Sequence, residues 1–296
     1  MRVDSREGCG FLPTVAVVLA THNRRSTTLR CLESLLDSAD ADSCRLRVIH
    51  VDDASPDGTA EAVLSLIPEA QQILGDGSLY WAGAMRLGLA RAYESQPDYV
   101  LWLNDDVVLR ESALHSLLTL SPDPEGHTIA VAAMRDPSTG ACSYSAVRAQ
   151  RSWRRTVFTP IEPSNTEHWT SGDTMNGNLV LVPRGVYERV GGFDPVFRHG
   201  MADFDYGLRA TRRHGVTVRV SPEFLGDCAQ NKLSESFRDP TLSLRARWAL
   251  MMSPKGLPPR QWIHFQRQHG GPTWVIPAFA PYLQVLLPHR RPSGIG

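Results

Sequence analysis

The first hundred residues alternate β-rich segments with amphipathic ones, and this alternation limits the fold more than any other feature of the sequence. The segments predicted as strands are Thr14–Ala20, Leu46–Asp52, Gln71–Leu74 and Tyr99–Leu103. Segments predicted as helices separate these strands. Apolar residues recur at helical spacing at Leu29, Leu32, Leu35 and Leu36, and further helices are predicted at Glu61–Ile67 and Ala82–Glu94. Continuous apolar strands joined by helices are typical of a sheet buried on both faces. We therefore predict an α/β fold with a doubly wound, mainly parallel, Rossmann-like sheet and helices on both faces.

The pattern is weaker in the rest of the chain. We expect strands at Thr128–Met134, Cys142–Val147, within Asn176–Pro183 and at Val216–Val220, helices at Arg184–Val190 and Met201–His214, and an inserted loop or flap at Arg151–Pro160. From Asn231 onward proline and arginine are frequent and no clear period is visible. We predict one domain over residues 1–230, with a nucleotide-binding half at about 13–106 and an acceptor half at about 107–230. Residues 231–296 would be a C-terminal extension packed on this domain.

Composition excludes several classes of function. Basic and acidic residues number 31 each, so no overall field attracts the chain to nucleic acid. The five cysteines are scattered without a CxxC spacing, which argues against a disulfide framework or a zinc site and favours the cytoplasm. Pro277 and Pro281 interrupt the apolar tail, so it is not a regular spanning helix. The tail could lie at a membrane surface or cover a cleft, although plain packing is the commoner outcome.

Polar side chains stand at three successive strand ends. They are Thr21 and Asn23, then Asp52 and Asp53, then Asn104, Asp105 and Asp106. Each group alone could be a turn or a helix cap. Together they indicate a ligand crevice at one edge of the sheet. The first strand-to-helix turn, "LATHNRRS", has no glycine, which disfavours a dinucleotide fold and a sugar-phosphate nucleotidyltransferase.

These motifs, in this order, resemble the family-two inverting nucleotide-sugar glycosyltransferases of the GT-A fold. The resemblance is carried by "LATHNR", "VDDASPDGT", "LNDDV" and "GGFDPVFRHGMADFDYGLRA", and it covers about Val15 to Val220. It implies a GT-A fold with a nucleotide-sugar donor, a hydroxyl acceptor and a hexosyltransferase type of activity.

The resemblance also implies donor-binding residues. Thr21, Asn23 and one of Asp52 or Asp53 would contact the nucleobase and ribose. Trp81 and Arg86, in "GSLYWAGAMRLG", are further donor-side candidates. Trp81 as a simple core aromatic is nearly as good an interpretation, and a solvated strand-end Asp is the plain alternative for the carboxylates.

A metal site is implied by the DxD-like motif, in which Asn104 replaces the first Asp. Asp106 is then the metal ligand and Asp105 a sugar or ribose contact. Mg²⁺ or Mn²⁺ suits carboxylate and diphosphate oxygens. Relatives supply a later His, but "FLGDCAQNK" offers Asp227 and Cys228 instead, and His264 and His269 are weak substitutes.

The resemblance assigns the catalytic base to the acceptor side. The Glu-Asp pair of the family is here Ala202-Asp203, so Asp203 inherits the role of general base and Asp205 a supporting one. Residues two apart lie on different faces of a helix, so only one is expected to face the acceptor. Acidic residues in the first turn of a helix are also explained by the helix dipole alone.

The predicted function is transfer of a sugar from a UDP- or dTDP-sugar to a hydroxyl of a glycan, a lipid-linked glycan or a small metabolite. Two rivals remain open. One is a catalytically idle nucleotide-sugar or glycan-binding protein, suggested by Asn104, Ala202 and the absent His. The other is a nucleotidyltransferase. The expected location is the cytoplasm, with peripheral contact to the inner face of the membrane through the tail.

Overall fold

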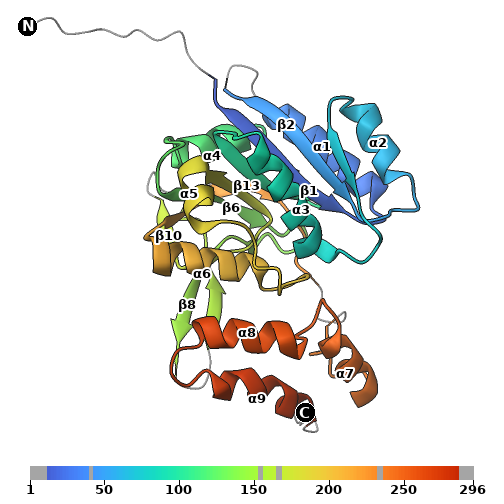
Figure 1. The fold of residues 1–296 in the computed structure, drawn as a ribbon, viewed down its shortest axis with the longest axis vertical. Coiled ribbons are helices and arrows are strands. Elements are labelled where there is room, and N and C mark those ends of the chain that lie inside the picture. Colours follow the sequence, from blue (N-terminus) through green and yellow to red (C-terminus); the bar gives the residue numbers. More distant parts are fainter. Residues whose placement is uncertain (1–11, 40–42, 153–155, 165–168, 232–235, 287–296) are drawn as a thin grey trace, which may run out of the picture.

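The computed structural model describes residues 12–39, 43–152, 156–164, 169–231 and 236–286. The first half of the chain alternates strands and helices: β1 (Thr14–Thr21), α1 (Arg25–Ser38), β2 (Arg45–Asp52), α2 (Thr59–Leu66), β3 (Gln71–Leu74), α3 (Tyr80–Glu94) and β4 (Tyr99–Asn104). The short β5 (Val108–Leu109) and α4 (Ala113–Leu120) follow. These strands and helices confirm the predicted α/β alternation (Figure 1).

The second half completes the same sheet. It contains β6 (Thr128–Arg135), β7 (Cys142–Tyr144), β10 (Thr170–Gly172), β12 (Leu179–Pro183), α5 (Arg184–Val190), α6 (Ala202–His214) and β13 (Thr217–Asp227). The main path of the sheet runs β10-β13-β6-β12-β4-β1-β2-β3. Strands β4, β1, β2 and β3 are parallel to one another, whereas β12 is antiparallel to both β4 and β6. The mainly parallel, doubly wound sheet is thus confirmed.

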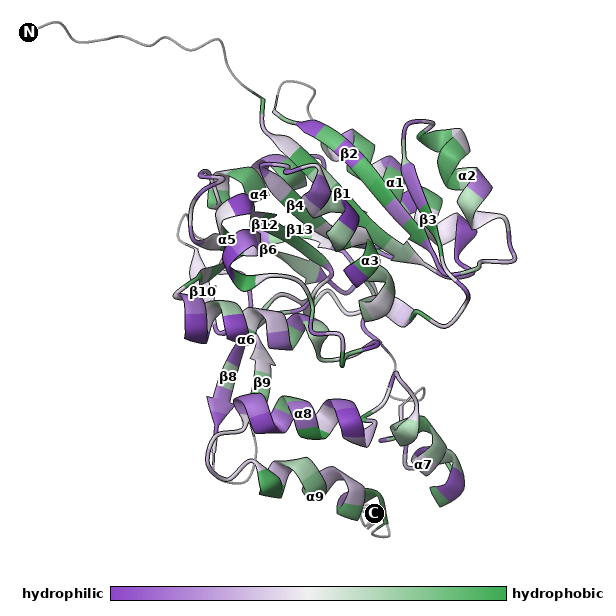
Figure 2. Cartoon of the chain, in the orientation of Figure 1, coloured by the Kyte–Doolittle hydropathy of each residue, from purple (hydrophilic) through white to green (hydrophobic). Residues whose placement is uncertain are grey.

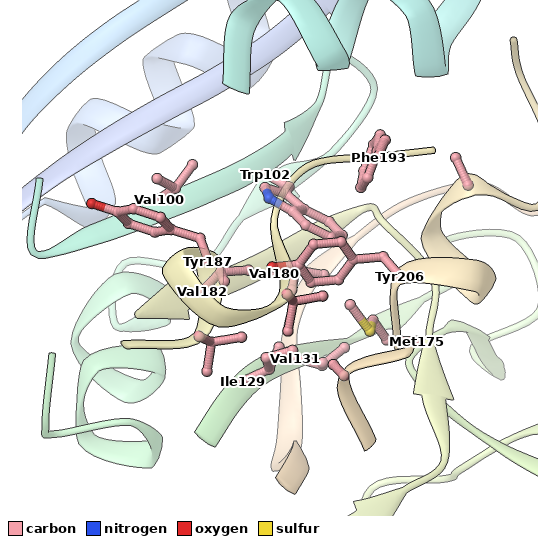
Figure 3. Close-up of a cluster of buried hydrophobic side chains, with 14 of the residues drawn as sticks. Val100, Trp102, Ile129, Val131, Met175, Val180, Val182, Tyr187, Phe193 and Tyr206 are labelled. Atoms are coloured by element: carbon pink, nitrogen blue, oxygen red, sulfur yellow. The ribbon is translucent and has the colours of Figure 1, made fainter. Parts of the chain in front are cut away.

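Side chains alternate between two cores, one on each face of the sheet. In β1, Val15, Val17 and Leu19 face the core beneath α1 and α4, while Ala16 and Val18 face the core beneath α3. In the latter core, Trp102 packs edge to face against Phe193 and Tyr206, with ring centroids 4.8 and 4.9 Å apart (Figure 3). Burial on both faces explains why the strands are continuous apolar runs.

The segment expected to be a loop or flap at residues 151–160 is largely β-structure. β8 (Ala146–Arg151) pairs with β9 (Thr156–Pro160), and β11 (Thr174–Met175) adds a third strand to this small sheet. The prediction was wrong because the residues of β8 and β9 are mostly half-exposed or exposed, so they lack the apolar signal of a buried strand. β13 is also longer than predicted and reaches Asp227.

The C-terminal extension, residues 231–296, contains three helices that its weak periodicity did not predict. They are α7 (Leu244–Met252), α8 (Pro259–His269) and α9 (Val275–Leu286). Figure 2 shows α8 and α9 as separate layers beyond α6, and α9 carries a large share of apolar residues. Within the described ranges, no helix combines the length and the apolar character needed to cross a bilayer. Residues 1–11 and 287–296 of the predicted units lie outside the described residues.

Candidate active site

Strand register brings the predicted polar residues to one edge of the sheet. Thr21 of β1 lies opposite Asp52 of β2, and Ala20 lies opposite Asn104 of β4. Two adjacent cavities open at this edge, and they share five lining residues: Arg24, Trp81, Asp105, His199 and Lys255. Their volumes, about 450 and 350 Å³, are in the range of small-molecule sites.

The smaller cavity is lined by Thr21 and Asp53 among others. Asp53 is almost fully buried, and its two carboxylate oxygens accept the backbone N–H groups of Gly77 (2.8 Å) and Tyr80 (3.1 Å). Tyr80 has a positive φ of 56°, a conformation that a non-glycine residue adopts only when its surroundings fix it. The carboxylate therefore organises the loop that leads into α3, where Trp81 begins the cavity wall.

Asp52 turns away from this cavity. Its carboxylate accepts the Thr21 hydroxyl (2.9 Å) and the backbone N–H of Ser55 (2.8 Å), which fixes the two strand ends relative to each other. Asn23 and Arg86 line neither cavity among the described residues. Of the two neighbouring carboxylates left open by the sequence, Asp53 is the one that faces the cavity.

The larger cavity is lined by Asn104, Asp105 and Asp106. One guanidinium nitrogen of Arg24, Nη1, lies 3.1 Å from Asp105 Oδ1 and 3.1 Å from Asp106 Oδ2. Burial raises the pKa of Asp105 to about 6, although the positive charge of Arg24 opposes this shift. A cation thus already lies between the two carboxylates.

Asp203 lines the same cavity, and contacts that run from Asn104 through Trp81 and Gly177 fix its position. Trp81 Nε1 donates to Asn104 Oδ1 (2.7 Å), and the Trp81 ring lies against Gly177. A Cβ atom at Gly177 would come within 2.7 Å of that ring, so glycine is required there. The Gly177 N–H donates to Asp203 Oδ2 (3.0 Å). Asn104 therefore helps to hold Asp203 from across the cavity.

Asp203 lies in the first turn of α6, after Met201, which has a positive φ of 70°. Burial raises the pKa of Asp203 to about 6, and the backbone N–H groups of Phe204 and Gly177 only partly offset the shift. A carboxylate with such a pKa is ionised at neutral pH yet basic enough to accept a proton.

Asp205 is fully buried and does not line the cavity. Its oxygens accept His269 Nε2 and Arg209 Nε, each at 2.8 Å. Burial opposes its ionisation, but the His269 hydrogen bond and the Arg209 charge outweigh burial and lower the pKa of Asp205. Its contacts therefore connect α6 to α8.

Of the five residues that line both cavities, sequence reasoning missed three: Arg24, His199 and Lys255. Among the described residues the buried Nδ1 of His199 has no hydrogen-bond partner. Burial, reinforced by the charges of Lys255 and Arg24, lowers the pKa of His199 to about 4, so the imidazole is neutral. Arg24 had a visible signal, a basic residue in the first strand-to-helix turn. Lys255 had none, because only the packing of the C-terminal extension brings it to the cavity.

The segment in which the resemblance expects a later His begins in the last residues of β13, which ends at Asp227. Asp227 is paired with Arg135 (2.8 Å), while the Cys228 thiol donates to Asp106 Oδ1 (3.5 Å). His264 and His269 are bonded to Asp194 and Asp205 respectively, away from this cavity. Among the described side chains of His, Cys, Asp and Glu, no three converge to hold a metal ion. Any ion here would need oxygens from a ligand or from water.

Comparison with known proteins matches residues 16–172, more than half of the chain, to the glycosyl transferase family 2. No curated protein sequence matches the chain. One similar solved structure is GalNAc-T7 with UDP, GalNAc and Mn²⁺, with 16% identity and a TM-score of 0.56. That match covers 74% of this chain and 43% of GalNAc-T7, so the chain spans less than half the length of that protein.

A second similar structure is the mannosyltransferase PcManGT from Pyrobaculum calidifontis in complex with GDP-Man and Mn²⁺. It shares 19% identity at a TM-score of 0.55, and the match covers 93% of this chain and 75% of that one. At these identities the two likenesses establish the fold, and it is the predicted GT-A fold.

Proposed function

The chain belongs to glycosyl transferase family 2, and we propose that it transfers a sugar from a nucleotide-sugar donor to a hydroxyl acceptor with inversion at the anomeric carbon. The observation that carries this proposal is the position of Asp203 in the same cavity as Asp105 and Asp106. A carboxylate with a pKa near 6 thus faces two carboxylates suited to a diphosphate-bound cation.

The two cavities suit the two ends of the donor. The smaller one, with Thr21 and Asp53, would take the nucleobase and ribose. Arg24 and Lys255 line both cavities and carry the positive charge that a diphosphate requires at the junction. Trp81, also shared, would lie beside the sugar. UDP- and dTDP-sugars are the donors we expect.

Asp105 and Asp106 fit a divalent cation by the chemistry of their donor atoms. Their carboxylates already hold the Arg24 guanidinium between them, as a stand-in cation. Asp106 would hold Mg²⁺ or Mn²⁺, and the bound ion would supply Lewis-acid neutralisation of the departing nucleotide diphosphate. On donor binding, the Arg24 side chain would exchange its carboxylate contacts for the diphosphate.

Asp203 would act as the general base. It takes the proton of the acceptor hydroxyl while that oxygen attacks the anomeric carbon and the nucleotide diphosphate leaves with the bonding pair. The Gly177 N–H and the wall formed by Trp81 hold the carboxylate in place for this step. Asp205 would support it indirectly, by anchoring α6. We place the reaction in the cytoplasm, the compartment that five scattered cysteines without a CxxC spacing favour.

The proposal is tested first by donor binding. Thermal-shift measurements over a panel of UDP-, dTDP- and GDP-sugars with Mn²⁺ should identify the nucleotide and then the sugar. Asp106→Ala should abolish the metal-dependent part of donor binding and leave the fold intact, since this half-exposed residue contributes little to the core. Unchanged metal-dependent affinity in that variant would remove Asp106 from the site.

Turnover separates the proposal from its two rivals. A working transferase should release nucleotide diphosphate slowly from the selected donor even without acceptor, whereas an idle binding protein should release none. A nucleotidyltransferase would form pyrophosphate instead. The anomeric configuration of the product, read from its proton NMR coupling, tests inversion directly.

A further inference from the structure

Helix α9 presents an apolar face to solvent. The side chains of this face are 44–63% exposed: Val275, Ile276, Phe279, Leu283 and Leu286. At 100° per residue these five positions fall within about 100° of arc, which makes one continuous stripe. The opposite side of the helix, with Pro277, Ala278 and Val285, is buried. Trp262 Nε1 and the Tyr282 hydroxyl fasten that side through backbone carbonyls.

Helices α7 and α9 together carry more than half of the exposed large apolar residues of the described chain. Thirteen large apolar residues are exposed there, and seven of them lie on α7 and α9, with Leu244 and Trp248 on α7. α7 packs against α9, so these two residues extend the apolar surface of the extension. Figure 1 shows α9 as the outermost layer, beyond α8. A patch of this kind on a layer remote from the sheet marks an interaction surface.

The charge of the same region is strongly one-sided. The whole chain balances 31 basic against 31 acidic residues, yet residues 240–296 contain seven Lys and Arg and no Asp or Glu. The exposed basic side chains of the described helices and loops are Arg245, Lys255, Arg260 and Arg267. None of these four forms an ion pair with a described residue.

We infer that the C-terminal extension docks on an anionic lipid surface, with the apolar stripe of α9 lying in the interface between headgroups and acyl chains. An exposed apolar helix face on a unit whose exposed charges, among the described residues, are all cationic is the combination that binds such surfaces. A second copy of the chain fits less well, because each copy would bring the same unneutralised positive charge to the contact.

The position of the extension also favours one class of acceptor. Leu250, Ser253 and Lys255 belong to the extension and line the larger cavity, so the cavity lies beside the surface-binding unit. Resting on the proposed function, this favours an acceptor whose hydroxyl is carried on a lipid in the same membrane. Lipid docking itself does not depend on the catalytic proposal.

The test is sedimentation of the full chain with vesicles of phosphatidylcholine that contain or lack phosphatidylglycerol. The chain should sediment with the anionic vesicles and much less with the neutral ones, and added salt should weaken the binding. The double variant Phe279→Ser, Leu283→Ser should bind the anionic vesicles about tenfold more weakly or worse. Leu74→Ser, at a 70% exposed apolar residue on β3, is the matched control and should bind like the wild type.

A charge variant tests the second half of the inference. Arg260→Gln with Arg267→Gln should weaken binding to anionic vesicles and remove most of its salt dependence. All variants should keep nucleoside diphosphate affinity, which separates failure of docking from failure of the proposed function. Failure of the wild type to bind anionic vesicles would overturn the inference. So would a dimer in light scattering that the stripe variant converts to monomer.

Discussion

Asp203 and Asp205 are two positions apart and have opposite electrostatic environments. Asp203 faces the larger cavity and has a pKa raised by burial to about 6. Asp205 is enclosed by Arg209 and His269, which together outweigh burial and lower its pKa. One residue is therefore suited to accept a proton at neutral pH, and the other is suited to remain ionised.

We expect Asp203→Asn to lower turnover by about 10²–10⁴-fold, the usual value of a positioned base. Asparagine preserves the size and one of the two oxygens that accept the Gly177 and Phe204 N–H groups, so donor affinity should not change. Steady-state turnover and donor titration of the same sample measure the two effects. Turnover close to wild type would leave Asp203 only a helix-capping role.

The pH profile gives an independent test of the same residue. If the ionised form of Asp203 is required, turnover should rise through pH about 6 and then level off, falling about tenfold per pH unit below that point. Nucleoside diphosphate affinity should be followed over the same range, since Asp105 has a similar pKa. A profile that is flat between about pH 5 and 8 would contradict the assignment.

At the scale of elements, α6 joins the larger cavity to the C-terminal extension. Its first turn carries Asp203, and the fully buried Asp205 bonds His269 at the end of α8. Arg209, one turn further along α6, donates both to Asp205 and to the carbonyls of Val190 and Gly192. Loss of the Asp205 charge should loosen both connections.

Asp205→Asn should therefore lower the free energy of unfolding by about 3 kcal/mol, because it removes the carboxylate partner of the Arg209 side chain, which is only 12% exposed. Because its folded-state pKa is depressed, the wild-type carboxylate stabilises the fold above the unfolded pKa of about 4, and this contribution is lost as pH falls through the folded pKa. Urea unfolding of Asp205→Asn and Asp203→Asn side by side measures the difference. Equal stability of the two variants would rule out this anchoring role.

Most elements of the sheet and its helices were predictable, because burial on both faces leaves continuous apolar runs in the sequence. The pair β8 and β9 was missed, since most of its residues are exposed or half-exposed and leave no apolar run, while backbone pairing joins the two strands. The helices of the extension were missed for a related reason. In α8 the buried positions include Gln261, Gln266 and His269, so no apolar period marks its inner face.

At the scale of the molecule, the extension helps to form the site. Lys255, in the turn between α7 and α8, lines both cavities although it lies far beyond the segment that matches the family. Seven predicted site residues line the cavities: Thr21, Asp53, Trp81, Asn104, Asp105, Asp106 and Asp203. These seven residues lie at or just after the ends of β1, β2 and β4, or in the first turns of α3 and α6. The order of the sequence motifs was therefore enough to predict them. Lys255 and His199 could not be found this way, because tertiary packing alone decides what they face.

We expect Lys255→Gln to weaken binding of the nucleoside diphosphate released by the preferred donor by about tenfold, because one charge-assisted contact to phosphate is lost. The corresponding nucleoside, which lacks phosphate, should bind as it does to the wild type. Arg267→Gln is the matched control, an exposed basic residue of the same extension that lines neither cavity. Calorimetric titration of both ligands measures the contrast, and an equal loss for nucleoside and diphosphate would place Lys255 elsewhere.

The bond between Asp205 and His269 limits how this chain could be recombined with its relatives. The segment that matches the family ends at residue 172, which makes the extension an obvious part to exchange in a chimaera. A transplanted extension would have to supply both a hydrogen-bond donor for Asp205 and a cation at the position of Lys255. A graft lacking the first would fold poorly, and a graft lacking the second would fold but hold its donor weakly. An exchanged extension would therefore have to bring both of these residues with it.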